Sequence, residues 1–226
     1  MIKALVFDFD GLILETEQPL YQSWQELYWE NGLDLPLEKW ALNIGTAEEL
    51  FDPFTELESL PNWSLEKNQE LSRRLQREME LIQSQPPRPG VEDYLKDAQR
   101  LGLKVGLASS SSCGWVTGHL ERLGLRQYFQ CIQARDDVAL TKPDPMLYQS
   151  TVEILGAKPE QAIAFEDSPN GILAAKRAGL HCVAVPSALT RYLDTSQADL
   201  MVNSLAEMRL EDLVKKIERG MRNEQG

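Results

Sequence analysis

The stretch Ala4-Leu5-Val6-Phe7-Asp8-Phe9-Asp10-Gly11 decides the fold. Its first half is a short apolar run, which is the pattern of a strand buried on both faces of a parallel sheet. Two aspartates, two residues apart, follow at once. Side chains at this spacing lie on the same side of an extended chain, and Gly11 permits a sharp exit from it. We therefore expect a buried strand with two carboxylates just beyond its end.

Four further apolar runs have the same character, and helical patterns separate most of them. These runs are Lys104–Ala108, Cys131–Gln133, Ala162–Phe165 and Cys182–Val185. One helical stripe follows Pro89-Gly90, and another follows Pro145. The alternation predicts an α/β fold with a doubly wound, Rossmann-like parallel sheet.

Residues 15–85 interrupt this alternation, because they contain no strand-like run and carry helical stripes instead. The two stripes are Leu20, Trp24, Leu27 and Tyr28, and Leu71, Leu75, Met79 and Ile82. We expect a smaller, all-helical cap domain at residues 15–85, inserted after the first strand into a core domain of residues 1–14 and 86–226. The two crossings, near Glu15–Pro19 and Gln83–Gly90, are candidate hinges.

The composition limits the partners and the location of the protein. The 226 residues are 42% hydrophobic, which is enough for a core domain and a smaller companion. The net charge is −12 and the chain lacks a dense Lys/Arg run, which argues against a nucleic acid or a membrane as partner. Three cysteines without a CxxC pair, and an apolar start too short for a signal core, predict a cytoplasmic protein with reduced thiols. We expect a monomer or a small homo-oligomer, and this composition still allows a small phosphorylated metabolite as its ligand.

Polar residues follow other predicted strands as well. Ser109-Ser110-Ser111-Ser112 follows one strand, Glu166-Asp167-Ser168 follows a later one, and Lys142-Pro143-Asp144-Pro145 precedes a helix. Ligands of open parallel sheets bind beyond the carboxyl ends of the strands. We therefore expect these residues to converge with Asp8 and Asp10.

This set of residues suits metal-assisted phosphoryl transfer. Four carboxylates and Lys142 would give the site a formal charge of −3, which would repel a phosphate dianion. A divalent cation removes the conflict, and Mg²⁺ takes hard oxygen ligands from one or two carboxylates. Asp8 would attack phosphorus to form an aspartyl-phosphate, and Asp10 would act as general acid and base.

The remaining polar residues have corresponding roles. Ser109 and the neighbouring backbone N–H groups would bind phosphate oxygens at the start of a helix, with Lys142 adding positive charge. Asp167 would complete the metal site. Any one of these motifs alone is typical of a turn, a helix N-cap or a solvated surface, so the prediction depends on their combination.

Four motifs in this order resemble those of the haloacid dehalogenase superfamily, and within it the β-phosphoglucomutase-like and phosphatase members with a helical cap. The motifs are Asp8-Phe9-Asp10-Gly11-Leu12, Leu107-Ala108-Ser109-Ser110-Ser111, Lys142-Pro143-Asp144-Pro145 and Phe165-Glu166-Asp167-Ser168. The resemblance spans nearly the whole chain.

The resemblance implies three groups of site residues. The catalytic residues would be Asp8, Asp10, Ser109 and Lys142. The metal site would comprise Asp8, Asp10 through its carbonyl, Asp167 and the adjacent Glu166. The substrate-binding residues would be Ser109, Ser110, Ser111 and Lys142, with Gly45 and Thr46 in a cap loop. A glycine that ends a helix explains Gly45 equally well.

Departures in the cap bear on the reaction. Leu20 aligns with a histidine that the sugar-phosphate mutases of this type carry, and Leu75 aligns with their lysine. Their cap-loop arginine is missing from Gly45-Thr46-Ala47-Glu48-Glu49. The sequence therefore predicts a hydrolase of small phosphomonoesters such as sugar phosphates. The alternatives are a sugar phosphomutase and a non-catalytic phosphometabolite-binding module.

Overall fold

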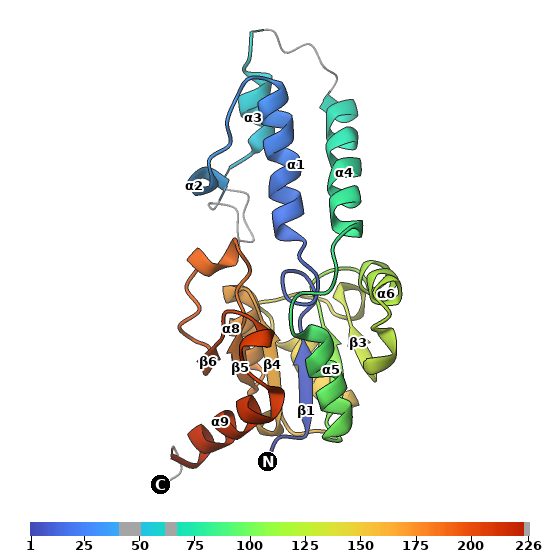
Figure 1. Ribbon diagram of the computed structural model, residues 1–226, viewed down its shortest axis with the longest axis vertical. Helices are drawn as coiled ribbons and strands as arrows, with labels where there is room; N and C mark the ends of the chain where they lie inside the picture. Colours follow the sequence, from blue (N-terminus) through green and yellow to red (C-terminus); the bar gives the residue numbers. More distant parts are fainter. Residues whose placement is uncertain (41–50, 62–66, 224–226) are drawn as a thin grey trace. The chain divides into compact units, whose positions relative to one another are not determined.

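The computed structural model describes residues 1–40, 51–61 and 67–223 (Figure 1). The chain divides into two compact units, one formed by Met1–Leu14 and Pro86–Gly226, the other by Glu15–Gln85. Within the described ranges, the helices lack the combination of length and apolar character that crossing a bilayer requires.

A parallel sheet forms the centre of the larger unit, and in the described residues it has six strands in the order β3-β2-β1-β4-β5-β6. The strands are β1 (Ala4–Phe7), β2 (Lys104–Ala108), β3 (Cys131–Gln133), β4 (Ala162–Glu166), β5 (His181–Ala184) and β6 (Leu200–Met201). The α/β fold with a parallel sheet is thus confirmed. β4 and β5 differ from the predicted bounds by one residue, and β6 was missed because two residues carry no periodic pattern.

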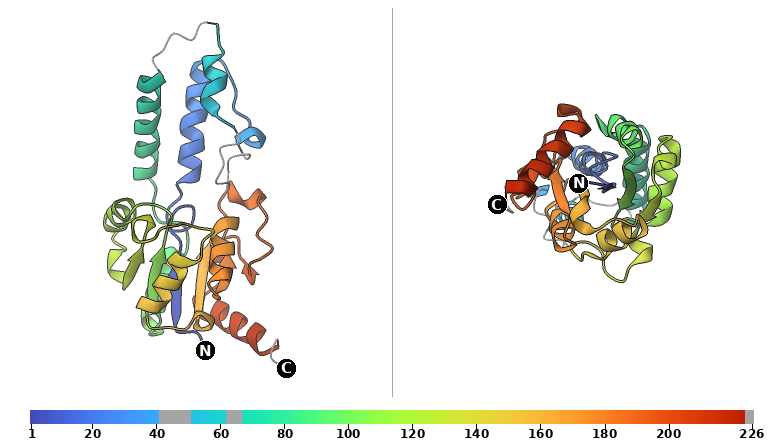
Figure 2. Two further views of the ribbon diagram at one scale, coloured as in Figure 1. Left: turned by 180° about the vertical axis from the view of Figure 1, so that it is seen from behind. Right: turned by 90° about the horizontal axis from the view of Figure 1, so that it is seen from below.

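Helices cover both faces of this sheet. They are α5 (Val91–Arg100), α6 (Cys113–Arg122), α7 (Met146–Ile154), α8 (Pro169–Arg177) and α9 (Leu210–Asn223). α7 packs on β1, β2 and β3, and α8 packs on β4 and β5, while α5 contacts β2 and α9. Seen from below, α5 and α9 lie on one side of the sheet and α7 and α8 on the other (Figure 2).

Residues of β1 and β4 face both helical layers. Val6 joins Tyr148 of α7 in the buried cluster on one face. On the other face, Phe7 stacks on Phe165 with ring centroids 4.8 Å apart, and Phe165 meets Tyr94 of α5 edge to face at 5.6 Å. Burial on both faces explains why the strands are continuous apolar runs.

The smaller unit is helical in its described residues. It contains α1 (Glu17–Glu30), α2 (Leu37–Trp40), α3 (Pro53–Glu58) and α4 (Lys67–Gln83). On α1 the predicted apolar stripe is buried at Trp24, Leu27 and Tyr28. The Tyr28 hydroxyl donates a 2.7 Å hydrogen bond to the Pro53 carbonyl, and Trp24 packs edge to face on Phe54.

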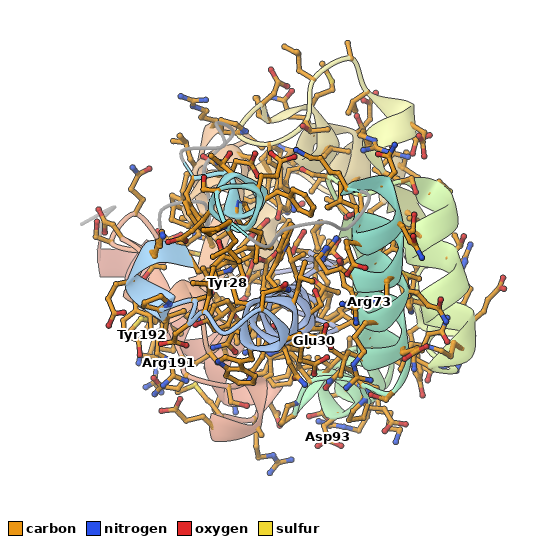
Figure 3. All side chains as sticks on the ribbon, turned by 90° about the horizontal axis from the view of Figure 1, so that it is seen from above. Tyr28, Glu30, Arg73, Asp93, Arg191 and Tyr192 are labelled. Carbon is orange, nitrogen blue, oxygen red and sulfur yellow. The ribbon has the colours of Figure 1, made fainter. Side chains whose placement is uncertain are left out.

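The predicted stripe on α4 is only partly buried, with Leu71 and Met79 half-buried. Ile82 is buried, but the Leu75 side chain is 51% exposed. Charged groups make much of the contact between α1 and α4 instead. Arg73 reaches from α4 to Glu30 at the end of α1, as Figure 3 shows, and the Arg74 guanidinium lies 4.7 Å from the Trp24 ring centroid. The long arginine side chains cover apolar surface that a leucine stripe would otherwise fill.

Candidate active site

The turn that follows β1 carries both aspartates of the first motif. The Asp8 N–H donates to the Phe165 carbonyl at 3.0 Å, which continues the pairing of β1 with β4. Gly11 then adopts a φ of +73°, and a Cβ at this position would overlap the Asp167 carboxylate. Only glycine therefore lets the turn pass so close to Asp167.

Lys142 links two of the predicted carboxylates. Its Nζ forms a hydrogen-bonded ion pair with Asp8 Oδ1 and another, at 2.6 Å, with Glu166 Oε1. The side chains of Lys142 and Asp8 are 6% and 9% exposed, and that of Glu166 is 0% exposed. Such a cluster avoids a large desolvation cost only when each charge is paired and hydrogen-bonded.

Both oxygens of Glu166 accept several hydrogen bonds. Oε1 accepts from Lys142 and, at 2.6 Å, from the Tyr148 hydroxyl. Oε2 accepts from the backbone N–H groups of Asp167 and Ser168 and from the Ser168 hydroxyl. A Cβ at Gly171, in the first turn of α8, would overlap this carboxylate. Glu166 is therefore fixed as the group that holds the Lys142 ammonium against Asp8.

Burial controls the ionisation of the cluster. Burial, and then the negative charge of Glu166, raise the pKa of Asp8 to about 8, although Lys142 opposes the shift. Burial disfavours the charge of Lys142, but the carboxylates of Asp8 and Glu166 outweigh it and raise the Lys142 pKa. Burial and Glu166 also raise the pKa of Tyr148, so its hydroxyl stays a hydrogen-bond donor.

Three buried carboxylates are suited to a metal ion. Asp8, Glu166 and Asp167 each offer an oxygen, and these oxygens all lie within 4.8 Å of one another. The Thr190 hydroxyl donates to Asp167 Oδ2 at 3.3 Å, and the buried Thr190 is itself hydrogen-bonded to Ser187. A set of carboxylate oxygens fits a hard divalent cation. The excess of negative charge and the raised Asp8 pKa are what a bound cation would relieve.

The Asp10 carboxylate has different partners from the Asp8 cluster. Ser111 Oγ donates to its Oδ2 at 2.6 Å, and the indole Nε1–H of Trp115 donates to its Oδ1 at 3.0 Å. The buried Ser109 accepts the Ser111 N–H at 3.0 Å, and Ser110 is exposed beside it. The loop between β2 and α6 thus lies against Asp10.

The structure brings together most of the residues that the sequence singled out. Asp8, Lys142, Glu166 and Asp167 form one cluster, and Asp10 lies with Ser109 and Ser111 at the start of α6. Gly45 and Thr46 lie outside the described residues.

Three supporting residues were missed by the sequence analysis. They are Trp115, Tyr148 and Thr190, none of which the sequence analysis predicts as a site residue. A usable signal existed for Trp115, which follows the serine run by three residues in the first turn of a helix. Tyr148 and Thr190 donate to Glu166 and Asp167, which lie 18 and 23 residues away in the sequence, and the local sequence pattern does not show such contacts.

Comparison with known proteins is consistent with this geometry. Residues 5–185 match the family model described as haloacid dehalogenase-like hydrolase. The chain is 48% identical over 210 residues to YhcW of Bacillus subtilis (strain 168), a protein named as a candidate phosphatase, which covers 93% of this chain and 95% of that protein. It is 31% identical over 186 residues to fructose-1-phosphate phosphatase YqaB of Escherichia coli (strain K12), covering 80% and 95% of the two chains.

A solved structure supports the same relationship. The crystal structure of β-phosphoglucomutase from Clostridium difficile superimposes with a TM-score of 0.71 at 25% identity, covering 98% of this chain and 99% of that chain. The family model spans most of the sequence and includes all the described site residues except Ser187 and Thr190. The chain therefore belongs to the haloacid dehalogenase-like hydrolase family.

Proposed function

We propose that this protein is a Mg²⁺-dependent phosphatase that hydrolyses a small phosphomonoester through an aspartyl-phosphate on Asp8. The observation that carries the proposal is the buried contact of Asp8 with Lys142, whose ammonium also forms an ion pair with Glu166. A carboxylate next to a fixed ammonium suits attack on a phosphoryl group, because the ammonium also attracts the phosphoryl oxygens.

Asp8 and Asp10 divide the chemistry of the proposed reaction. An Asp8 oxygen bonds to phosphorus while the bond to the leaving oxygen breaks, and Asp10 gives its proton to that oxygen. Water then attacks the same phosphorus, Asp10 takes a proton from it, and inorganic phosphate leaves with Asp8 restored. Ser109, the N–H groups near Ser110 and Ser111, and Lys142 would bind the phosphoryl oxygens throughout.

The carboxylates of Asp8 and Asp167 and the backbone carbonyl of Asp10 would hold Mg²⁺. When bound, the ion neutralises negative charge on the phosphoryl oxygens. Glu166 contributes by holding Lys142, because both of its oxygens already accept hydrogen bonds.

Residues 15–85 are proposed to act as a cap that selects the substrate, with the two crossings as hinges. A sugar phosphate is the favoured substrate class, supported by the name of the fructose-1-phosphate phosphatase relative. A sugar phosphomutase is the second candidate, since the β-phosphoglucomutase matches nearly the whole chain. The exposed Leu75, where those mutases carry a lysine, supports hydrolysis.

We also place the protein in the cytoplasm, a proposal that rests on its cysteines. Cys113, Cys131 and Cys182 are all unpaired. Unpaired thiols are typical of a reducing compartment.

A screen of phosphorylated metabolites, with Mg²⁺ or EDTA, tests the proposal when both released phosphate and isomerised product are measured. We expect phosphate release that needs Mg²⁺ and falls at least ~10³-fold in Asp8→Asn. Asp212→Asn, at an exposed aspartate of α9, is the matched control and should retain full activity. Full turnover by Asp8→Asn would refute the mechanism, and isomerised product with little released phosphate would favour the mutase.

A further inference from the structure

The Asp10 carboxylate is held at both oxygens by two nearby side chains, Ser111 in the loop before α6 and Trp115 in the first turn of α6. Ser111 and Trp115 donate to Oδ2 and Oδ1, at 2.6 and 3.0 Å. Rotation of the carboxylate about its χ angles would break at least one of these hydrogen bonds. The loop before α6 and the first turn of this helix therefore set the direction in which the Asp10 carboxylate points.

The indole of Trp115 is itself held from several sides. Its backbone N–H donates to Ser112 Oγ, which caps the helix, at 3.3 Å. One turn later, the buried His119 ring meets the indole edge to face with centroids 4.4 Å apart. His119 Nδ1 accepts a hydrogen bond from Arg122, and its ring also lies near Phe9, the residue between the two aspartates. These contacts therefore fix the orientation of the indole independently of its hydrogen bond to Asp10.

The two donors differ in what they can accept. An indole N–H only donates, whereas a serine hydroxyl can donate or accept. Asp10 Oδ1, which faces Trp115, must therefore be an acceptor in both protonation states. Oδ2, which faces Ser111, is left as the oxygen that can carry a proton while both contacts are kept.

We propose that Trp115 is a positioning residue for Asp10, and that its indole N–H assigns the exchangeable proton of Asp10 to Oδ2. The inference rests on the proposed function, because it requires Asp10 to protonate the departing oxygen. In that step the Asp8–phosphorus bond forms, the bond from phosphorus to the leaving oxygen breaks, and the Oδ2 proton moves to that oxygen. An alkoxide needs this proton in order to leave, whereas 4-nitrophenolate leaves as a stable anion.

Trp115→Phe tests the inference because it keeps an aromatic ring against His119 and removes the N–H, together with one ring of the indole. We expect kcat/KM for a sugar phosphomonoester to fall about tenfold. General acid catalysis contributes ~10²–10⁴-fold, and the variant loses one of the two hydrogen bonds that orient the acid, Asp10. kcat/KM for 4-nitrophenyl phosphate should change less than ~3-fold, because its leaving group needs no proton. Tyr94→Phe is the matched control, since it also removes one hydrogen-bond donor from a buried aromatic side chain, the hydroxyl that donates to the Met208 carbonyl at 2.8 Å. It should leave both values unchanged.

A spectroscopic measurement tests the hydrogen bond without relying on turnover. The chain has five tryptophans, so ¹⁵N labelling gives five indole N–H signals. The signal missing from Trp115→Phe should shift in Asp10→Ala, while the other four stay in place. If Trp115→Phe does not fold, the Trp→Phe variants at the other four positions identify the same signal.

The outcomes separate this inference from the proposed function. A selective loss on the sugar phosphate together with the indole shift supports the inference. Equal losses on both substrates would show that Trp115 only packs, and an unmoved indole signal would show that the hydrogen bond is absent; either result overturns the inference and leaves the phosphatase intact. Full activity of Asp8→Asn would instead overturn the proposed function, whatever the indole signal shows.

Discussion

The Tyr148 hydroxyl and the Lys142 ammonium donate to the same oxygen of Glu166, Oε1, each at 2.6 Å. A buried tyrosine from the core of α7 is thus joined through Glu166 to the ammonium that contacts Asp8. Because this contact joins the hydrophobic core to the candidate active site, a substitution of Tyr148 is expected to affect both the stability of the fold and the activity.

Tyr148→Phe should lower both stability and activity. The Glu166 carboxylate loses one donor in a fully buried place, so we expect a free energy of unfolding lower by about 1–3 kcal/mol. Lys142 becomes less well fixed, and kcat should fall several-fold. Tyr94→Phe is the matched control, because Tyr94 is also buried and donates to the Met208 carbonyl at 2.8 Å. Urea unfolding should show a loss in both variants; a kcat loss in the control as well would contradict the specific role of Tyr148.

Gly11→Ala should impair metal binding. The new Cβ would overlap Asp167 Oδ2 and also sit at a φ of +73°. We expect the Mg²⁺ concentration for half-maximal activity to rise at least tenfold. Gly102→Ala carries the φ penalty alone, about 1–2 kcal/mol, because its φ is +68° and no atom lies within 4 Å of its Cβ. Unchanged Mg²⁺ dependence in Gly11→Ala would show that Asp167 needs no such clearance.

Mg²⁺ should stabilise the folded protein, because it binds the native carboxylate cluster. Mass action predicts a gain of about 2.7 kcal/mol in the free energy of unfolding at a hundredfold excess over Kd. Thermal unfolding in Mg²⁺ and in EDTA measures this gain, which should vanish in Asp167→Asn. An equal gain in that variant would place the ion elsewhere.

The stability of the metal-free protein should depend on pH through Asp8. Its pKa rises from 3.8 to about 8 on folding, mainly through burial. Between these values the native state holds a proton that the unfolded state has released, so the free energy of unfolding falls as pH rises. In EDTA we expect a decline across this window that is shallower in Asp8→Asn. Identical slopes in the two proteins would show that Asp8 does not titrate in this way.

Features set by neighbouring residues in the sequence could be predicted, whereas contacts between residues far apart in the sequence could not. The strand Ala4–Phe7 could be predicted because burial on both faces leaves a continuous apolar run. The position of the two aspartates could be predicted because they follow this strand directly in the sequence. Leu75 was predicted to lie in a buried stripe and is exposed. Periodicity cannot show that Arg74, from the same helix, packs on Trp24 of α1. The contact of Trp115 with Asp10 joins residues 105 positions apart, and no local pattern encodes such a pairing.

Direct detection of phosphorylated Asp8 tests the central claim most directly. Rapid quenching during turnover in Mg²⁺, followed by mass spectrometry of the peptide that contains Asp8, should show one added phosphoryl group on that residue. With 4-nitrophenyl phosphate, whose leaving group needs no proton, the group should accumulate in Asp10→Asn, which lacks the base for the second step. It should be absent in EDTA and in Asp8→Asn. Phosphate release at the wild-type rate with no phosphoryl group on Asp8, or with the group on another residue, would contradict the account.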